Sequence, residues 1–332
     1  MLRTGDVRAA AAELAGEVDV ARLRERVAAL PAPRSSLHSP DRMRAAADLV
    51  ESWFAAAGLA AERQPVSVTG VTGYRDHEPF DKVRYDRLDG VNVLATQPGL
   101  ASEAIVLLAH YDTVRDSPGA DDNTASVVAL AEVAHLLAAR SPYRTVVYAV
   151  TDLEELGFFG AYALADLLAT RHRVRLAVNF ECLAYTDPAP GSQRMSKGLG
   201  LLYPRQVAWI RRRGQRGDFT ALLHNRAATG PVRLLRRALA GSGVASVALA
   251  DPNGLPLVGG WIRRNVRGAR NFRRSDHVAF WDRDIPAVQL TDTADLRYPH
   301  YHRPTDTVDR LDLVRVRDIV AATAAVIGHL AG

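Results

Sequence analysis

Short apolar runs alternate with helix-length segments along most of this 332-residue chain. The apolar runs are typical of strands buried on both faces, and the segments between them have the spacing of helices that face a core. Expected strands are 90–96, 104–109, 144–150, 174–180 and 285–290, and expected helices are 39–58, 126–138, 158–168 and 313–330. This alternation predicts an α/β protein with a largely parallel sheet between helices. Ligands of such sheets bind beyond the carboxyl ends of the strands.

Acidic and histidine residues occur near the carboxyl ends of the predicted strands, where this rule places ligands. They follow three of the predicted strands, precede one helix and follow the last strand. They are His110, Asp112, Asp121, Asp122, Glu154, Glu155, Glu181 and His302. So many acids in one crevice would repel each other unless cations were present. The single cysteine, Cys182, excludes an intrachain disulfide and a cysteine-based zinc site, so His, Asp and Glu would have to hold any metal.

The number of these residues suits a pair of zinc ions. Catalytic zinc takes three protein ligands and a water molecule, so two ions that share one carboxylate need five protein residues. We expect Asp121 to bridge the two ions. His110 and Glu181 would complete one site, and Glu155 and His302 would complete the other.

Two further acids have expected roles beside the ligands. Glu154 is the expected general base, and Asp112 is the expected acceptor for the second imidazole N–H of His110. Each signal has a structural alternative when it is taken alone. The paired glutamates could begin a solvated helix, and the paired aspartates could cap one. Their occurrence in order at successive strand ends favours the metal site.

Several strings of residues carry a resemblance to a known family. HYD, GADDN, EE, NFE and YHRPTD follow one another in this order, and SDHVAF precedes the last predicted strand. In these strings the chain, from about 90 to 312, resembles the co-catalytic di-zinc aminopeptidases of clan MH. Relatives in that clan include bacterial leucine aminopeptidases, glutamate carboxypeptidase, the glutaminyl cyclases and the transferrin receptor ectodomain.

The resemblance implies an open, mixed, mainly parallel eight-stranded sheet sandwiched by helices. It implies two Zn²⁺ ions, for which Mn²⁺ or Co²⁺ could substitute. It also implies that Tyr301 helps to stabilise the oxyanion, with a packing role as the alternative. Two positions depart from the family pattern: Glu181 stands where many relatives have Asp, and residues 124–126 replace the usual Ala-Ser-Gly.

The segment 182–274 has no counterpart that we can align, and it is rich in arginine. Residues 201–274 hold fifteen arginines and two acids, a net charge of +13, while the whole chain carries +5. We interpret about 183–274 as an insertion over the active-site edge of a single domain, 1–332, which begins with helices in 1–58. Helices are expected in the insertion near 206–213 and 232–239.

These features favour a zinc-dependent exopeptidase that acts on peptides or on amino-acyl small molecules, with an aminopeptidase as the leading interpretation. Glu154 would accept a proton from a metal-bridging water that attacks the scissile carbonyl. One alternative is a carboxypeptidase or amidohydrolase that binds an acidic substrate through an arginine of the insertion. The candidate arginines are Arg263, Arg264, Arg267, Arg273 and Arg274. The same residues would also suit a glutaminyl cyclase-like transferase, and the same fold could serve a non-catalytic binding module.

No stretch approaches the ~18 continuous apolar residues of a membrane-spanning helix, and no secretory signal is visible at the N-terminus. We therefore expect a cytoplasmic protein without a membrane partner. The arginines lack a recognisable nucleic-acid reading motif, which disfavours a nucleic-acid partner. The oligomeric state is left open.

Overall fold

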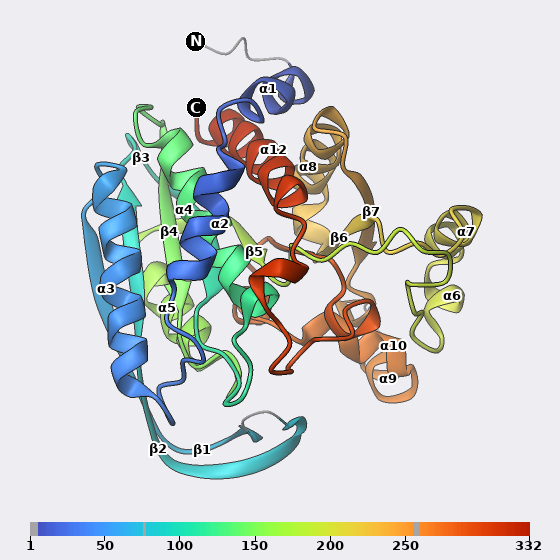
Figure 1. The fold of residues 1–332 in the computed structure, drawn as a ribbon, viewed down its shortest axis with the longest axis horizontal. Coiled ribbons are helices and arrows are strands. Elements are labelled where there is room, and N and C mark those ends of the chain that lie inside the picture. Colours follow the sequence, from blue (N-terminus) through green and yellow to red (C-terminus); the bar gives the residue numbers. More distant parts are fainter. Residues whose placement is uncertain (1–5, 76–77, 255–258) are drawn as a thin grey trace.

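An eight-stranded mixed sheet runs through the middle of the molecule (Figure 1). The computed structural model describes residues 6–75, 78–254 and 259–332, without the side chains of 78–80, 263 and 267. The strand order is β1-β2-β4-β3-β5-β8-β6-β7. The strands are β1 (Ala61–Arg75), β2 (Glu78–Gln97), β3 (Ala101–His110), β4 (Arg144–Thr151), β5 (Arg173–Phe180), β6 (Phe219–His224), β7 (Ala245–Ala250) and β8 (Ala287–Thr291).

The four central strands, β4, β3, β5 and β8, are parallel. Their register pairs His110 with Thr151 and Phe180 with Leu290, so their carboxyl ends lie along one edge of the sheet. The outer pairs are mixed: β2 is antiparallel to β4, and β6 is antiparallel to β8 but parallel to β7. The expected open, mixed, mainly parallel sheet of eight strands is confirmed.

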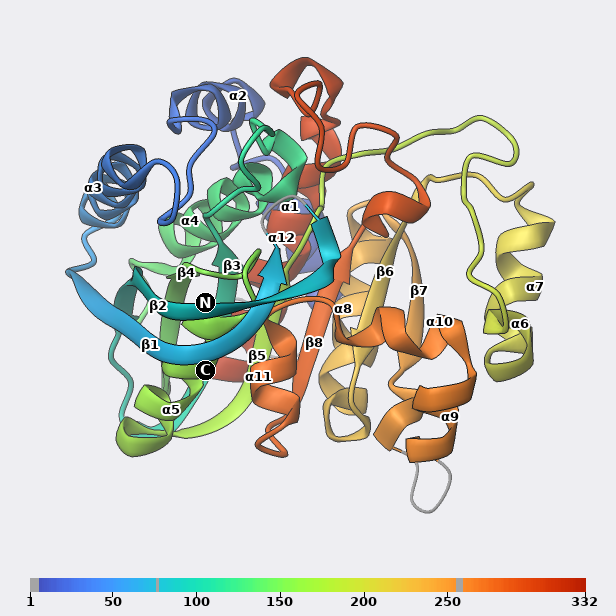
Figure 2. The same ribbon diagram turned by 90° about the horizontal axis from the view of Figure 1, so that it is seen from below.

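Helices cover both faces of the sheet (Figure 2). The helices are α1 (Val7–Leu14), α2 (Val20–Ala29), α3 (Pro40–Ala56), α4 (Ala125–Leu137), α5 (Phe159–Arg171), α6 (Leu199–Leu202), α7 (Pro204–Arg212), α8 (Thr229–Gly241), α9 (Gly259–Asn265), α10 (Arg267–Arg270), α11 (His277–Trp281) and α12 (Leu313–Ala331). Successive residues of β3 enter different cores: Leu107 packs with α4 and α12, and Leu108 packs with α5 and α11. Because both faces are buried, the strand shows no polar alternation. Within the described ranges, no helix has the length and apolar character needed to cross a bilayer.

The arginine-rich segment differs from the expectation in one respect. It contributes β6 and β7 to the sheet itself, while α6, α7, α9 and α10 lie outside that end (Figure 2). The interpretation of 183–274 as an insertion over the sheet edge is therefore incomplete. These two strands have only six residues each, and the glycines and arginines that surround them hide the strand pattern in the sequence.

A long hairpin, β1–β2, extends beyond the sheet (Figure 1). Only 93–97 of β2 pair with β4, and the rest of the hairpin pairs with itself. The sequence pattern found only 90–96 of it, because the outer part buries few side chains. At its far end, the Tyr74 N–H donates to the carbonyl of Leu156 (2.9 Å), and a Cβ on Gly73 would lie 2.1 Å from the same oxygen. The hairpin therefore contacts the turn that follows β4.

The start of α5 packs against that same turn, and this contact can be tested. A Cβ on Gly160 would lie 2.1 Å from the carbonyl oxygen of Asp152 and 2.6 Å from Oδ1 of Asn92. We expect Gly160→Ala to lower the free energy of unfolding by about 1–3 kcal/mol, as measured by urea denaturation. Gly230→Ala in α8 is the matched control, because no heavy atom of the described residues, apart from the adjacent residues and the backbone of its own helix, lies within 4 Å of its added Cβ. Equal effects of the two substitutions would contradict this packing argument.

Candidate metal centre

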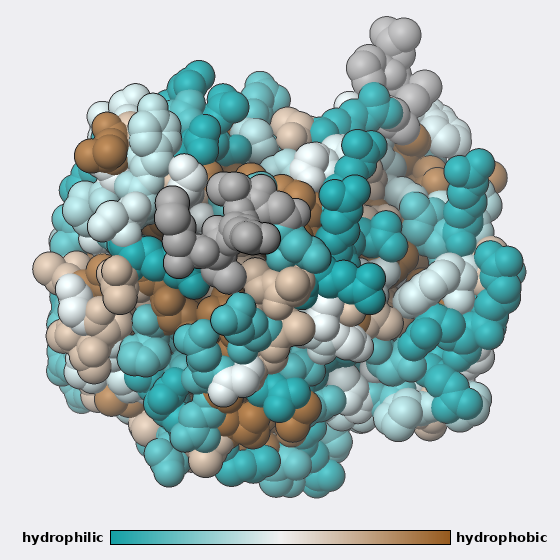
Figure 3. Space-filling model, turned by 90° about the horizontal axis from the view of Figure 1, so that it is seen from above, coloured by the Kyte–Doolittle hydropathy of each residue, from teal (hydrophilic) through white to brown (hydrophobic). Residues whose placement is uncertain are grey.

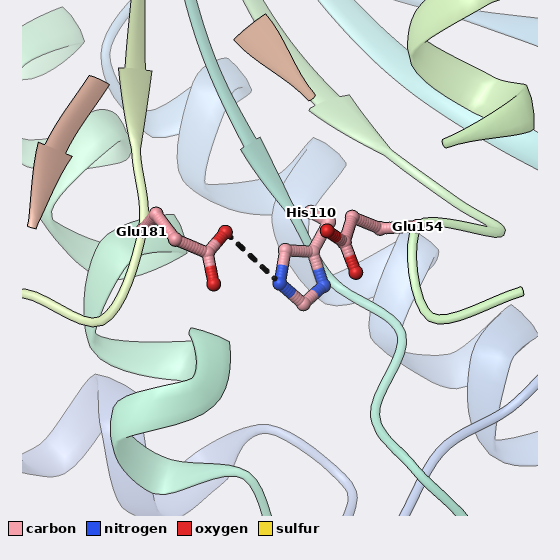
Figure 4. A group of neighbouring side chains, drawn as sticks. All are labelled: His110, Glu154 and Glu181. Atoms are coloured by element: carbon pink, nitrogen blue, oxygen red, sulfur yellow. Dashed lines mark ion pairs between the residues drawn. The ribbon is translucent and has the colours of Figure 1, made fainter. Parts of the chain in front are cut away.

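Histidine and acidic side chains from five segments meet at the carboxyl ends of the central strands. His110 ends β3, the two glutamates 154 and 155 follow β4, and Glu181 follows β5. Asp122 belongs to the turn before α4, and His302 belongs to the loop after β8. Figure 4 shows His110 between Glu154 and Glu181, with all three side chains directed toward one another. Their ligand atoms all lie within 4.8 Å of one another.

Asp122 lies between the two histidines. His110 Nε2 is 3.2 Å from one carboxylate oxygen of Asp122, and His302 Nε2 is 3.0 Å from the other. Each histidine also has a glutamate beside it: Glu181 Oε2 is 3.4 Å from His110 Nε2, and Glu155 Oε2 is 3.4 Å from His302 Nε2. The site thus consists of two sets of three residues that share one carboxylate.

The prediction that Asp121 lies between the histidines is wrong. Its carboxylate accepts a hydrogen bond from the Ala184 N–H (2.8 Å) and interacts with the carboxyl of Asp292. The backbone of Asp122 departs from helical geometry (φ −111°, ψ 84°). The carboxylates of Asp121 and Asp122 therefore contact different parts of the structure. Asp122 faces the histidines, and Asp121 holds the loop that follows Glu181.

The unpaired atoms of this site are the atoms that a metal would need. Both carboxylate oxygens of Asp122, Nε2 of both histidines and Oε1 of Glu155 are buried and have no hydrogen-bond partner among the described residues. A buried polar atom without a partner costs about 1–3 kcal/mol. Imidazole nitrogen and carboxylate oxygen are the ligands that zinc prefers in catalytic sites. The residues therefore fit divalent metal binding.

The electrostatics of the site are dominated by buried carboxylates. Burial raises the pKa of Glu154 and of Glu155 well above the usual range, and neighbouring carboxylates add to the effect. Burial lowers the pKa of His302, but Glu155 and Asp122 outweigh it and raise that pKa to about 9. A bound cation would offset the charge of these carboxylates.

Asp112 contacts both the histidine and the glutamates. Its carboxylate accepts hydrogen bonds from the backbone N–H groups of Glu154 (3.2 Å) and Glu155 (3.1 Å). His110 Nδ1 is 3.1 Å from the Asp112 carbonyl oxygen and 3.4 Å from its Oδ1. The hydrogen bond of His110 Nδ1 thus goes to the backbone carbonyl of Asp112, and acceptance of that N–H by the Asp112 carboxylate stays a prediction. The Asp112 carboxylate also positions the turn that carries both glutamates.

A short chain of hydrogen bonds holds Glu181. Asn179 Nδ2 donates to Ser275 Oγ (2.7 Å), and Ser275 Oγ donates to Glu181 Oε2 (2.7 Å). Asn123 holds the adjacent backbone, since its Nδ2 donates to the Phe180 carbonyl and its Oδ1 accepts from the Cys182 N–H. The longer arm of glutamate at position 181 is therefore oriented by neighbours on both sides.

Asp306 is a structural residue of the site that sequence reasoning did not assign. Its two carboxylate oxygens accept hydrogen bonds from the backbone N–H groups of Asp121 (2.9 Å) and Asp122 (3.2 Å). The Tyr298 hydroxyl donates to the same carboxylate (2.8 Å). Asp306 ends the YHRPTD string and Ser275 begins SDHVAF, so the strings that carry the family resemblance already contained both residues.

Two tyrosines lie at the margin of the site. Tyr301 stacks on His302, with ring centroids 3.8 Å apart, and together with Glu181 it lines a neighbouring cavity. Tyr74, from the β1–β2 hairpin, contacts the ring of Phe158 (5.8 Å between centroids). Burial raises the pKa of Tyr74, and the charge of Glu154 raises it further. Sequence reasoning missed Tyr74 because only the folded hairpin brings it to the site.

The described candidate arginines do not form one cluster. Arg274 lines the cavity beside the site and pairs with Asp295 (2.8 Å), and Arg273 pairs with Asp282. The side chains of Arg263 and Arg267 lie outside the described residues. Other arginines line a separate groove between α1, α8 and α12: Arg8, Arg233, Arg236 and Arg237. Figure 3 shows a face of the molecule where hydrophilic side chains are interspersed with small apolar areas.

Comparison with known proteins gives relatives over most of the chain. The chain is 29% identical over 301 residues to the uncharacterized protein YfbL of Escherichia coli. This match covers 87% of this chain and 80% of YfbL. It is 26% identical over 233 residues to the probable lipoprotein aminopeptidase LpqL of Mycobacterium tuberculosis, and this match covers 67% of this chain and 41% of that one.

Solved structures share the fold at low sequence identity. The LapA aminopeptidase of Legionella pneumophila superposes with a TM-score of 0.66 at 15% identity, over 97% of this chain and 74% of that one. The glutaminyl cyclase of Fimbriiglobus ruber superposes with a TM-score of 0.61 at 19% identity, over 94% of this chain and 95% of that one. The sequence pattern of peptidase family M28 matches residues 92–220 and 259–327, more than half of the chain. This protein therefore belongs to peptidase family M28.

Proposed function

We propose that this protein is a two-zinc aminopeptidase that removes the N-terminal residue from peptides or amino-acyl small molecules. One observation carries the proposal: each carboxylate oxygen of Asp122 faces the nitrogen of a different histidine, and none of these four atoms has a hydrogen-bond partner among the residues described. The ligands of one ion would be His110, Asp122 and Glu181, and those of the other His302, Asp122 and Glu155. Mn²⁺ or Co²⁺ could replace zinc in such an oxygen-rich site.

Family membership and the names of the relatives support peptide hydrolysis. LpqL and LapA are both named as aminopeptidases. A glutaminyl cyclase has the same fold, so the fold by itself does not distinguish hydrolase from transferase. Two complete sets of three ligand residues favour the hydrolase, because the cyclase alternative needs one zinc.

The proposed reaction uses Glu154 to move one proton. When bound, the two ions would polarise the scissile carbonyl and lower the pKa of a water molecule. Glu154 would accept a proton from that water as its oxygen attacks the carbonyl carbon. The same carboxyl would then donate the proton to the leaving amine nitrogen as the C–N bond breaks. The raised pKa of Glu154 suits a group that must both accept and return a proton.

The charges beside the site bear on the carboxypeptidase alternative. Arg274 is the described candidate arginine that reaches the cavity, but Asp295 already balances its charge. This pairing weighs against a carboxypeptidase that uses Arg274 to receive a terminal carboxylate.

Metal content distinguishes the two adjacent aspartates. We expect Asp122→Ala to lose at least one of two bound zinc ions per chain, because its carboxylate serves both ligand sets. Asp121→Asn should retain the wild-type zinc content, since Asp121 faces Ala184 rather than the histidines. Elemental analysis of dialysed protein measures both. Loss of zinc from Asp121→Asn alone would reverse the assignment.

The proposed role of Glu154 predicts that its substitution lowers kcat without loss of zinc. Glu154→Gln should keep the wild-type zinc content but lower kcat by about 10²–10⁴, because the amide cannot accept the proton. Glu155→Gln is the matched control one residue away, and it should lower zinc content as well. Steady-state kinetics measure kcat, and elemental analysis measures the zinc content of both variants. Wild-type kcat in Glu154→Gln would remove this residue from the mechanism.

A substrate panel tests the function itself. We expect zinc-dependent hydrolysis of aminoacyl-p-nitroanilides, abolished by a chelator and restored by added Zn²⁺. Peptides with a C-terminal glutamate should be cleaved from their amino end, as mass spectrometry of the products would show. Release of the C-terminal residue would instead support a carboxypeptidase. Cyclisation of N-terminal glutamine without hydrolysis would support the transferase.

A further inference from the structure

A cavity opens beside the metal centre. Its empty volume is about 810 Å³, including the part open to solvent. Glu181 and Tyr301 line it, so the cavity and the metal centre share residues. Residues of strands β6, β7 and β8 line it, together with residues of the loops and short helices that lie outside the sheet. A side chain of a substrate held at the metal centre could therefore extend into it.

The walls of the cavity are largely apolar. On the sheet side they consist of Phe219, Ala221, Leu223, Val247 and Leu249, and on the opposite side of Met195, Leu199, Ile210 and Phe272. Most of these residues belong to one buried cluster. Such walls suit a large apolar or aromatic group, and a few polar atoms among them decide specificity.

One polar atom on these walls, among the described residues, lacks a hydrogen-bond partner. Gln289 of β8 is 5% exposed, and its Oε1 is buried and makes no hydrogen bond within the part of the chain that the structure describes. Other polar groups of the lining are paired: Gln193 Nε2 donates to Thr293 Oγ1 (2.9 Å), and Asn271 Nδ2 donates to Ser196 Oγ (2.8 Å). Gln289 is thus poised for a donor that arrives with a ligand.

The register of the sheet gives the position of Gln289 relative to the metal centre. Phe180, which precedes Glu181, pairs with Leu290, and Gln289 pairs with Asn179 and with Leu223. Gln289 therefore lies about two residues farther from the metal centre than Glu181, about 7 Å along the strand. A phenol ring with its hydroxyl spans such a depth, whereas a leucine side chain ends short of it.

The chemistry of the walls limits the donor that can reach Gln289. A charged ammonium would be buried among apolar groups, and burying an unpaired charge is costly. A neutral hydroxyl loses little by leaving water if it gains one hydrogen bond. Phenylalanine fills the same space but leaves the amide oxygen unpaired.

We propose that this cavity receives the side chain of an N-terminal tyrosine, with the phenol hydroxyl donating to Gln289 Oε1. The proposal rests on the aminopeptidase function and specifies its substrate. Gln289 then determines specificity for the hydrogen-bonding end of the side chain. The apolar walls select its aromatic body.

The test compares tyrosyl- and phenylalanyl-p-nitroanilide with the zinc-loaded enzyme. We expect kcat/KM for the tyrosyl substrate to be about tenfold higher. Gln289→Leu and Gln289→Met should bring the ratio to about one or below, because they keep the volume and remove the acceptor. Leu249→Met, on the same wall, is the control and should change kcat/KM for both substrates by the same factor. Melting temperatures check that each variant is folded.

A binding measurement separates this proposal from the proposed function. Calorimetric titration with L-tyrosinol and L-phenylalaninol should show about tenfold tighter binding of L-tyrosinol to the wild type and equal binding to Gln289→Met. The role of Gln289 would be overturned if the wild type bound both alcohols with the same affinity and hydrolysed both p-nitroanilides with the same kcat/KM. Zinc-dependent hydrolysis would still support the aminopeptidase in that case. If no p-nitroanilide is hydrolysed, the proposed function fails, and the titration alone decides for or against the cavity's preference.

Discussion

Mutual repulsion of buried carboxylates is the constraint around which this structure is organised. Asp122, Glu154, Glu155 and Glu181 lie beside two histidines, and the site has too few positive charges to balance them. Burial and neighbouring carboxylates raise the pKa of Glu154 and of Glu155 well above the usual range. A pair of divalent ions would balance this charge, and the unpaired nitrogen and oxygen atoms are placed to bind them.

The surrounding structure keeps these groups from moving apart. Asp112 and Asp306 each accept two backbone N–H groups from the turns that carry the acidic residues. Ser275 orients Glu181. These supports come from segments far apart in sequence, and the parallel strands bring them together at one edge of the sheet. The same edge holds the apolar cavity, so the charged centre and the proposed side-chain pocket depend on one arrangement of strands.

Local patterns predicted much of this arrangement. Buried parallel strands are recognisable because both faces are apolar, and the polar residues after them stand out for the same reason. The strand that ends at His110 and the positions of Glu154 and Glu155 could therefore be found from sequence alone. The hairpin around Tyr74 and the strands β6 and β7 could not, because their side chains are partly exposed or their runs are too short for a periodic signal.

The choice between Asp121 and Asp122 separates what could be inferred from the sequence from what required the folded structure. Residue types and their order were enough to indicate a parallel sheet with a site for divalent metal at its carboxyl edge, since burial and charge leave a local imprint on composition. Which of two adjacent carboxylates faces the histidines depends on backbone angles in one turn, on a hydrogen bond from the Ala184 N–H and on one to the Asp306 carboxylate. The unpaired oxygen of Gln289 depends likewise on which strands lie beside β8. Contacts between distant segments settle such questions, because a side chain's direction and partners exist only once the chain has folded.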